Sequence, residues 1–161
     1  MTKLDKDVVD RMVEEFPDQY AFKYTTLDYT RTYSEFRDDV DTFCRTLLAL
    51  GVKKGTHVAV WATNIPEWFI TFWATTKIGA VLVTVNTAYK IHEIEYLLRQ
   101  SDTHTLIMIE YCKDINYKEI IDEDYKKDLT NVPRLGMIFH FLKKKDKNGN
   151  EKCWIKYDEK R

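Results

Sequence analysis

Residues that build several common kinds of catalytic and metal site are scarce in this chain. Its 161 residues include five glycines, three prolines and three cysteines. The cysteines, Cys44, Cys112 and Cys153, are odd in number and show no C-x-x-C spacing, which favours structural thiols in a reducing compartment. Serine occurs only at Ser34 and Ser101, and neither lies in the G-x-S-x-G turn that exposes a nucleophilic serine. We therefore expect a cytoplasmic protein without a disulfide scaffold or that type of hydrolase site.

An excess of charge of one sign is also absent. The formal net charge is −1 at pH 7, which gives no general attraction to nucleic acid or to anionic membranes. The first ten residues contain no apolar run of the kind found in a signal peptide, so we expect none. The most apolar window, residues 65–85, contains Glu67 and Lys77 and is divided by Gly79, whereas a membrane span needs about 20 mostly uncharged residues. We predict no transmembrane segment.

Two consecutive strand–loop–helix units, from Val58 to Ser101, form the centre of the sequence. The predicted strands are short and uniformly apolar, which is typical of strands buried on both faces of a parallel sheet. They cover residues 58–61, 81–85 and 105–109, and the helices between them cover residues 65–78 and 91–99. The composition, 44% hydrophobic and 32% charged, suits one soluble domain with a hydrophobic core. We predict an α/β fold in which helices flank a parallel sheet.

Helix boundaries are marked by capping signals. Thr32 and Glu35 match a capping box at the start of a helix that Gly51 ends. Asn64 is placed to cap the next helix, with Pro66 in its first turn. Gly79 is placed to end that helix.

Additional elements are predicted on both sides of this centre. On the N-terminal side we expect an amphipathic helix over residues 5–16 and a hairpin of strands 20–26 and 31–33. On the C-terminal side we expect a helical or irregular segment, 117–127, and a hairpin of strands 135–142 and 153–157. The predicted organisation is a helix and strand (1–30), a βα core (31–110), and an irregular segment with a hairpin (111–161).

Three stretches resemble known motifs but fit plainer structural interpretations. Residues 51–56, GVKKGT, resemble a phosphate loop, but they join a helix to a strand, whereas a P-loop joins a strand to a helix. His92 and Glu93 begin like the zinc motif H-E-x-x-H, but Tyr96 replaces the second histidine. Residues 146–150 match the start of an EF-hand loop without its later glycine and glutamate, so a β-turn is favoured. We predict a helix end with a turn, a polar helix face and a hairpin turn, respectively.

The remaining candidate groups also have structural interpretations. We expect the scattered histidines to be structural or surface residues and the short lysine run to belong to a solvated hairpin. These residues are His57, His104 and His140, and Lys143–Lys145. The residues alone therefore indicate a competent α/β scaffold with no catalytic, cofactor-binding or metal site.

The segment from Arg31 to Glu110 resembles the N-terminal part of the AMP-forming acyl-CoA synthetases, in the adenylate-forming ligase superfamily. The matching pieces are TYSEF (32–36), LGVKKGTHVAV (50–60), NIPEW (64–68), KIGAV (77–81), VNTAY (85–89) and EIEYL (93–97). Their order and spacing are those of the family, and the N-x-A-Y variant resembles the fatty-acid-activating branch. Thr56 stands where the family usually has aspartate, at a surface turn.

The resemblance implies a larger enzyme that activates a carboxylate, here a fatty acid, with ATP and magnesium and transfers it to coenzyme A. It also implies that residues 1–161 are the incomplete N-terminal α/β portion of the large domain of such an enzyme, because the family's Pro-Lys-Gly phosphate loop has no counterpart here. No catalytic residue is carried over. We expect the chain alone to be inactive and to self-associate through surface that the rest of the domain would cover. The alternatives are a free-standing, non-catalytic binding module and an unrelated flavodoxin-like nucleotide binder.

Overall fold

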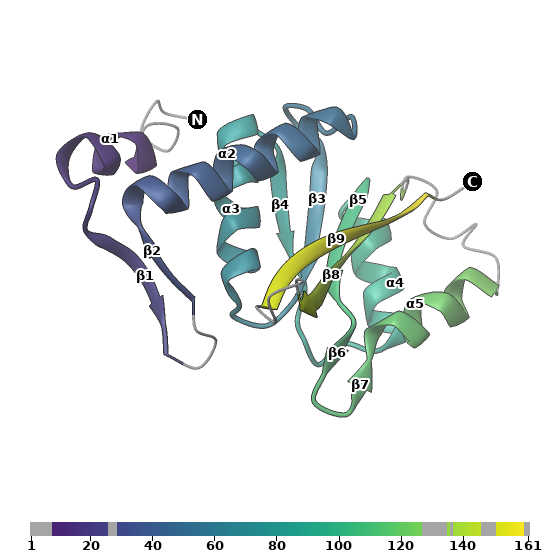
Figure 1. The fold of residues 1–161 in the computed structure, drawn as a ribbon. Helices are drawn as coiled ribbons and strands as arrows, with labels where there is room; N and C mark the ends of the chain where they lie inside the picture. Colours follow the sequence, from purple (N-terminus) through teal and green to yellow (C-terminus); the bar gives the residue numbers. More distant parts are fainter. Residues whose placement is uncertain (1–7, 26–28, 127–134, 136, 146–150, 160–161) are drawn as a thin grey trace. The chain divides into compact units, whose positions relative to one another are not determined.

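The structure is a computed structural model that describes residues 8–25, 29–126, 135, 137–145 and 151–159 (Figure 1). The chain divides into two compact units. The first takes residues 1–55 and 64–81, and the second takes residues 56–63 and 82–161. The chain thus passes from the first unit to the second, back again, and once more to the second.

The first unit combines a β-hairpin with three helices. The predicted hairpin is confirmed, since β1 and β2 pair in antiparallel fashion. The predicted helices are also present, with ends shifted by a few residues. The elements are α1 (Val8–Glu15), β1 (Tyr20–Tyr24), β2 (Tyr29–Thr32), α2 (Tyr33–Ala49) and α3 (Pro66–Ile78).

The predicted capping box at the start of α2 is confirmed. The Thr32 hydroxyl accepts a hydrogen bond from the Glu35 backbone N–H at 3.2 Å, and the Glu35 carboxylate accepts one from the Thr32 N–H at 2.9 Å. The bond from the Thr32 N–H lowers the pKa of Glu35, because it favours the charged carboxylate. At the other end, Gly51 adopts a φ of +87°, which a residue without a side chain reaches at little cost.

The predicted cap of α3 is wrong by one position. Ile65, not Asn64, is the N-cap residue, and it makes no side-chain cap hydrogen bond. The reason is Pro66, which occupies the first helical turn and holds the preceding residue in an extended conformation (Ile65 φ −102°, ψ 161°). Gly79 ends the helix in the left-handed conformation, as predicted.

Polar contacts connect the elements of the first unit. Asp39 of α2 accepts hydrogen bonds from the Tyr29 hydroxyl (2.9 Å) and from the Arg31 guanidinium (2.8 Å) of the hairpin. Lys77 of α3 forms an ion pair with Asp41 of α2 at 2.7 Å and with Asp10 of α1 at 3.4 Å. The hairpin and all three helices are therefore joined through charged groups at α2 and α3.

The second unit contains a five-stranded sheet with the strand order β4-β3-β5-β8-β9. β3, β5 and β8 are parallel, and β9 runs antiparallel to β8, which confirms the C-terminal hairpin. The predicted turn at residues 146–150 lies outside the described residues. The strands of the sheet are β3 (His57–Trp61), β4 (Val81–Thr84), β5 (Thr105–Ile109), β8 (Met137–Lys145) and β9 (Glu151–Glu159).

Further elements of the second unit follow its strands. The segment after Glu110 contains a small antiparallel hairpin that the sequence did not reveal. It is followed by a regular helix where a helical or irregular segment was expected. These elements are α4 (Ile91–Gln100), β6 (Tyr111–Cys112), β7 (Ile115–Asn116) and α5 (Tyr117–Lys126).

Burial in the sheet differs between its strands. Val58–Trp61 of β3 and Thr105–Met108 of β5 are buried, as predicted for strands covered on both faces. β4 does not fit that prediction, because Val81 is 42% exposed. The cause is its place at the edge of the sheet, where a strand has a neighbour on one side only.

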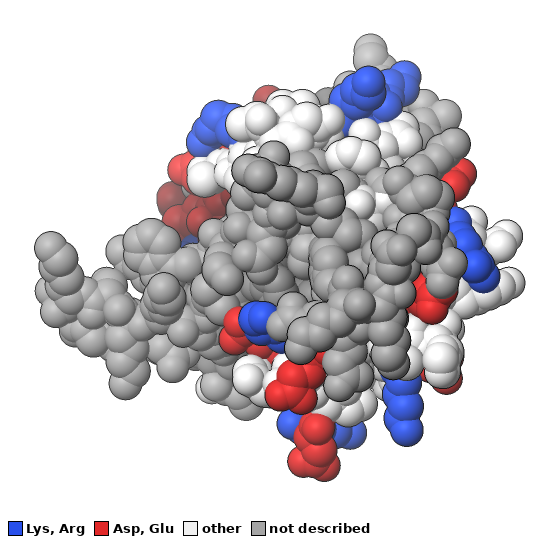
Figure 2. Space-filling model, turned by 90° about the vertical axis from the view of Figure 1, so that its right-hand side faces the viewer, with Lys and Arg blue, Asp and Glu red and all other residues white. Residues whose placement is uncertain are grey.

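The described part of the face in Figure 2 shows no extended region of one charge. Lysine, arginine, aspartate and glutamate side chains are interspersed among uncharged residues on the described part of the face in Figure 2. Within the described ranges, no helix is long and apolar enough to span a lipid bilayer.

Candidate functional site

The strand order of the second unit identifies the place where a ligand site is expected. β3 and β5 are neighbours, yet the chain continues from β3 to β4 on one side and from β5 to β8 on the other. In open α/β sheets, ligands bind beyond the carboxyl ends of the strands at such a switch point. The carboxyl end of β3 is Trp61, which pairs in register with Met108 of β5. This end of the sheet is therefore the first candidate site.

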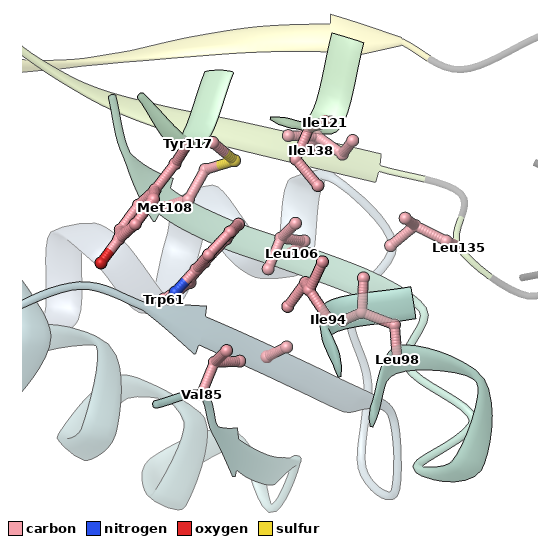
Figure 3. Close-up of a cluster of buried hydrophobic side chains, with 11 residues drawn as sticks. Trp61, Val85, Ile94, Leu98, Leu106, Met108, Tyr117, Ile121, Leu135 and Ile138 are labelled. Carbon is pink, nitrogen blue, oxygen red and sulfur yellow. The ribbon is translucent and has the colours of Figure 1, made fainter. Parts of the chain in front are cut away.

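Two stacked aromatic rings lie at the carboxyl end of β3. The Trp61 ring stacks on the Tyr117 ring with centroids 3.9 Å apart and an interplanar angle of 12° (Figure 3). Tyr117 is held beside β5 because its backbone N–H donates to the Glu110 carbonyl at 2.9 Å. Both side chains are completely buried. The carboxyl end of β3 is thus anchored in the buried core cluster of the second unit.

The same two rings hold the loop between β4 and α4. Trp61 Nε1 donates to the Asn86 carbonyl at 3.1 Å, and the Tyr117 hydroxyl donates to the Thr87 carbonyl at 2.6 Å. The Asn86 side chain accepts from the Ala88 N–H at 2.9 Å, which closes a local turn. Two successive carbonyls of the loop are therefore fixed from neighbouring elements. The sequence placed Asn86 at a strand end but gave no signal for the roles of Trp61 and Tyr117.

The electrostatics of Tyr117 suit a structural donor. Burial raises the pKa of its hydroxyl, and the adjacent Cys112 thiol raises it further. Tyr117 is therefore protonated at neutral pH and donates its proton to the Thr87 carbonyl. A general base would need a pKa near the working pH. The arrangement positions a loop and does not supply acid–base chemistry.

The phosphate-loop interpretation of residues 51–56 is not supported by the geometry. The Gly51 N–H donates to the Leu48 carbonyl, the Val52 N–H to the Leu47 carbonyl, and the Gly55 N–H to the Gly79 carbonyl, at 2.9–3.0 Å. A phosphate loop needs backbone N–H groups that point at the ligand. Here these donors are used inside the protein, as expected for a helix end followed by a turn.

The His92–Tyr96 stretch lies on the outer face of α4. His92, Glu93 and Tyr96 are exposed, whereas Ile94 and Leu98 are buried, as predicted for a polar helix face. A shallow depression of about 270 Å³ lies beside them. Its lining is Tyr89, His92, Glu93, Tyr96 and Leu97. The depression is smaller than typical ligand pockets of about 300–1,000 Å³.

Two of the histidines make local structural contacts. His57 Nδ1 is hydrogen-bonded to the Ser101 carbonyl, and the His104 N–H donates to the His57 carbonyl at 3.0 Å. His104 Nδ1 contacts the Thr105 hydroxyl at 3.0 Å. Both residues therefore join the start of β3 to the chain that leads into β5.

The cysteines that the structure describes are free thiols. Cys44 is buried, and burial together with the nearby Asp41 charge raises the pKa of its thiol to about 11. A reactive cysteine has a lowered pKa, so Cys44 is an inert core residue. Cys112 is partly buried. The side chains of His140, Cys153 and Lys143–Lys145 lie outside the described part of the structure.

The described residues do not fit the magnesium and nucleotide that the family resemblance implies. They contain no group of three or more His, Cys, Asp or Glu side chains that could hold a metal ion. In the turn at residues 51–56, the backbone N–H groups of Gly51, Val52 and Gly55 already donate to carbonyls of the protein and are not free for phosphate. No step of a reaction can therefore be assigned to these residues.

Comparison with known proteins relates this arrangement to a family of enzymes. The family model described as AMP-binding enzyme matches residues 9–155. "Putative acyl-CoA synthetase YngI" of Bacillus subtilis (strain 168) is 41% identical over 130 residues, which are 76% of this chain and 23% of that protein. "Medium-chain acyl-CoA ligase ACSF2, mitochondrial" of Danio rerio is 33% identical over 111 residues, which are 69% of this chain and 18% of that protein. The chain therefore spans about a fifth of the length of these relatives.

A solved structure supports the fold. The N-terminal domain of FACL13 from Mycobacterium tuberculosis matches 77% of this chain with a TM-score of 0.70 and 24% identity. The match covers 30% of that domain's chain. The prediction that the fold is an α/β portion of a larger domain is thereby confirmed. By sequence and by fold, the chain belongs to the AMP-binding enzyme family and corresponds to the N-terminal part of its acyl-CoA synthetases and ligases.

Proposed function

We propose that this chain is the N-terminal scaffold portion of an acyl-CoA synthetase that activates a fatty acid. The larger enzyme would join the carboxylate to ATP, forming an acyl-adenylate and releasing pyrophosphate. It would then transfer the acyl group to the sulfur of coenzyme A and release AMP. ATP, magnesium and coenzyme A are thus the cofactor and partners of the larger enzyme, and none is assigned to a residue of this chain.

The observation that carries the proposal is the family match over residues 9–155. At the carboxyl end of β3, the stacked rings of Trp61 and Tyr117 fix the loop that follows β4. A buried core at this end of the sheet suits a supporting wall. Electrostatic stabilisation of transferring phosphates would come from parts of the enzyme beyond this segment.

Inactivity of the isolated chain is the first consequence to test. Purified protein would be incubated with ATP, magnesium, coenzyme A and a panel of fatty acids, and pyrophosphate release would be measured. We expect no release above a heat-denatured control. Turnover by the 161-residue chain would show that it contains a complete site and would overturn the scaffold proposal.

Two further properties belong to the same proposal. The free thiols of Cys44 and Cys112 suit a reducing compartment, and we propose the cytoplasm, although the Danio rerio relative is named as mitochondrial. We also propose that the isolated chain self-associates at high concentration, because exposed apolar patches favour association. Light scattering that shows a clean monomer at high concentration would count against self-association.

A further inference from the structure

The last strand of the five-stranded sheet, β9, has a described strand neighbour on one side only. It pairs with β8 along its nine residues, and it ends the order β4-β3-β5-β8-β9 (Figure 1). The other described strands pair elsewhere, because β1 with β2 and β6 with β7 form separate two-stranded sheets. The backbone N–H and C=O groups on the outer edge of β9 therefore have no strand partner within the described residues. Such an edge is a template for pairing with another chain.

Charged residues normally protect a strand edge against association, and β9, with the sequence EKCWIKYDE, carries several. Inside the sheet, one of them lies opposite a like charge, because the register pairs Lys152 with Lys144 of β8. Like charges directly opposite one another on neighbouring strands are destabilising. A partner strand with an acidic residue opposite Lys152 would offset this repulsion from the other side.

A second copy of β9 supplies that acidic residue when the two strands pair antiparallel about Ile155. In a two-fold symmetric antiparallel pair, one residue lies opposite its own copy, and residues equally distant from it on either side lie opposite each other. With Ile155 at the axis, Lys152 lies opposite Asp158 of the second copy, and symmetry gives this pair twice. Glu151 and Glu159 form the one like-charged pair, at the ends of the paired region. The charge pattern of β9 is thus largely complementary to itself.

The neighbouring symmetric registers lack this match. An axis at Trp154 places Lys152 opposite Lys156 of the second copy, and an axis at Lys156 places that residue opposite its own copy. Both registers set like charges directly opposite one another, which is unfavourable. The same lysines that oppose other pairings therefore favour the register about Ile155, which also pairs the strand over its full length.

We propose that this chain forms a two-fold symmetric dimer in which the β9 strands of two copies pair antiparallel about Ile155 and join their sheets. The occupant of the edge is a second copy of this chain. The inference rests on the self-association proposed above and names its surface and register. Dimerisation is measured without substrate, so its failure is distinct from a failure of the proposed activity.

Disulfide trapping tests the register. Ile155→Cys in a Cys153→Ser background places one thiol of each copy at the axis, where opposite Cα atoms lie about 4.5–5.5 Å apart, within disulfide reach. Tyr157→Cys in the same background is the matched control, because its two thiols are offset by roughly 14 Å along the strands. With Cys153 retained, Tyr157→Cys should form a disulfide, because these two positions lie opposite each other. Peptide mass spectrometry identifies each bond.

Charge reversal tests the same pairing without a new cysteine. Lys152→Asp and Asp158→Lys should each weaken the dimer roughly tenfold, since each change turns two opposite-charge pairs into like-charge pairs. The double variant restores the opposite charges and should dimerise like the unchanged chain. Sedimentation equilibrium gives the dissociation constants, and circular dichroism shows whether the variants are folded.

Hydrogen–deuterium exchange of the unchanged chain needs no variant, so misfolding of a variant still leaves a decisive measurement. Amide groups of β9 should become protected as the protein concentration rises through the dissociation constant. The proposal is overturned by a monomer at high concentration, by β9 amides whose exchange is independent of concentration, or by a double charge variant that stays as weak as the single ones. Self-association with a disulfide in the Tyr157→Cys control and none in Ile155→Cys would reject this register.

Discussion

Trp61 and Tyr117 are the residues on which the functional interpretation of the second unit depends. These two buried rings stack at the carboxyl end of β3, the end of the sheet where related architectures place ligands. They donate hydrogen bonds to the successive carbonyls of Asn86 and Thr87. Neither role was foreseen from the sequence. A tryptophan at the end of an apolar strand predicts only burial, and the stacking partner is 56 residues away, so only the folded chain brings the two rings together.

Removal of the Tyr117 hydroxyl tests its hydrogen bond to the Thr87 carbonyl. Tyr117→Phe keeps the stacked ring but leaves the Thr87 carbonyl without its donor. We expect a loss of about 1 kcal/mol in the free energy of unfolding, measured by urea denaturation, because a buried hydrogen bond contributes about 0.5–1.5 kcal/mol. Tyr111→Phe is the control, since Tyr111 is 61% exposed. Equal stability of the two variants would contradict the structural role of the Tyr117 hydroxyl.

Cys44 and Cys112 should differ in reactivity. Alkylation requires the thiolate, and the pKa of about 11 leaves roughly one Cys44 thiol in a thousand ionised at pH 8. We expect iodoacetamide to modify Cys112 first and Cys44 only after unfolding or at strongly alkaline pH. Peptide mass spectrometry with a urea-denatured control gives the order. Modification of Cys44 as fast as Cys112 in the folded protein at pH 8 would show that the thiol is not buried as described.

At the scale of elements, the sequence predicted most helices and strands because their signals are local. Hydrophobic periodicity and the Thr32–Glu35 capping box depend on residues within one or two turns. The wrong predictions have causes that lie outside the local pattern or that compete with it. Pro66 moved the cap of α3 to Ile65, and the exposure of β4 follows from its position at the sheet edge. The small hairpin of β6 and β7 was missed because two-residue strands have no periodicity to detect.

The capping box of α2 gives a prediction at this scale. Thr32→Ala removes the hydroxyl that accepts from the Glu35 N–H and should lower the free energy of unfolding by about 1 kcal/mol. Thr32→Ser retains an oxygen at the same place and should stay close to the unchanged chain. Thermal or urea denaturation of the three proteins distinguishes these outcomes. An equal loss in both variants would mean that the hydroxyl does not act as the cap.

The contribution of the Glu35 carboxylate to stability, the other hydrogen bond of this capping box, should depend on pH. The pKa of Glu35 is lowered in the folded state from its usual value of 4.5. A lowered pKa means that the carboxylate stabilises the fold above pH 4.5, and that this stabilisation is lost as the pH falls through the folded-state value. The melting-temperature difference between the unchanged chain and Glu35→Gln should therefore be largest near pH 7 and shrink below about pH 4. A difference that is constant from pH 7 to pH 3 would contradict this assignment.

At the scale of the whole molecule, the fold could be predicted further than the function. The α/β class, the family and the status of the chain as part of a larger domain follow from residues that are all present. The fatty-acid substrate could not be derived from these residues. The described part of the chain holds no metal-ligand group, and its glycine turn uses its own N–H donors.

The central claim is that this chain can serve as the N-terminal scaffold of an acyl-CoA synthetase. The most direct test is a hybrid in which this chain replaces the matched 130 residues of the Bacillus subtilis relative. Pyrophosphate release that depends on ATP, coenzyme A and fatty acid would be measured for the hybrid, the unchanged relative and the 161-residue chain alone. We predict turnover by the hybrid and by the relative, and none by the chain alone. A folded but inactive hybrid beside an active relative, or turnover by the chain alone, would contradict the account.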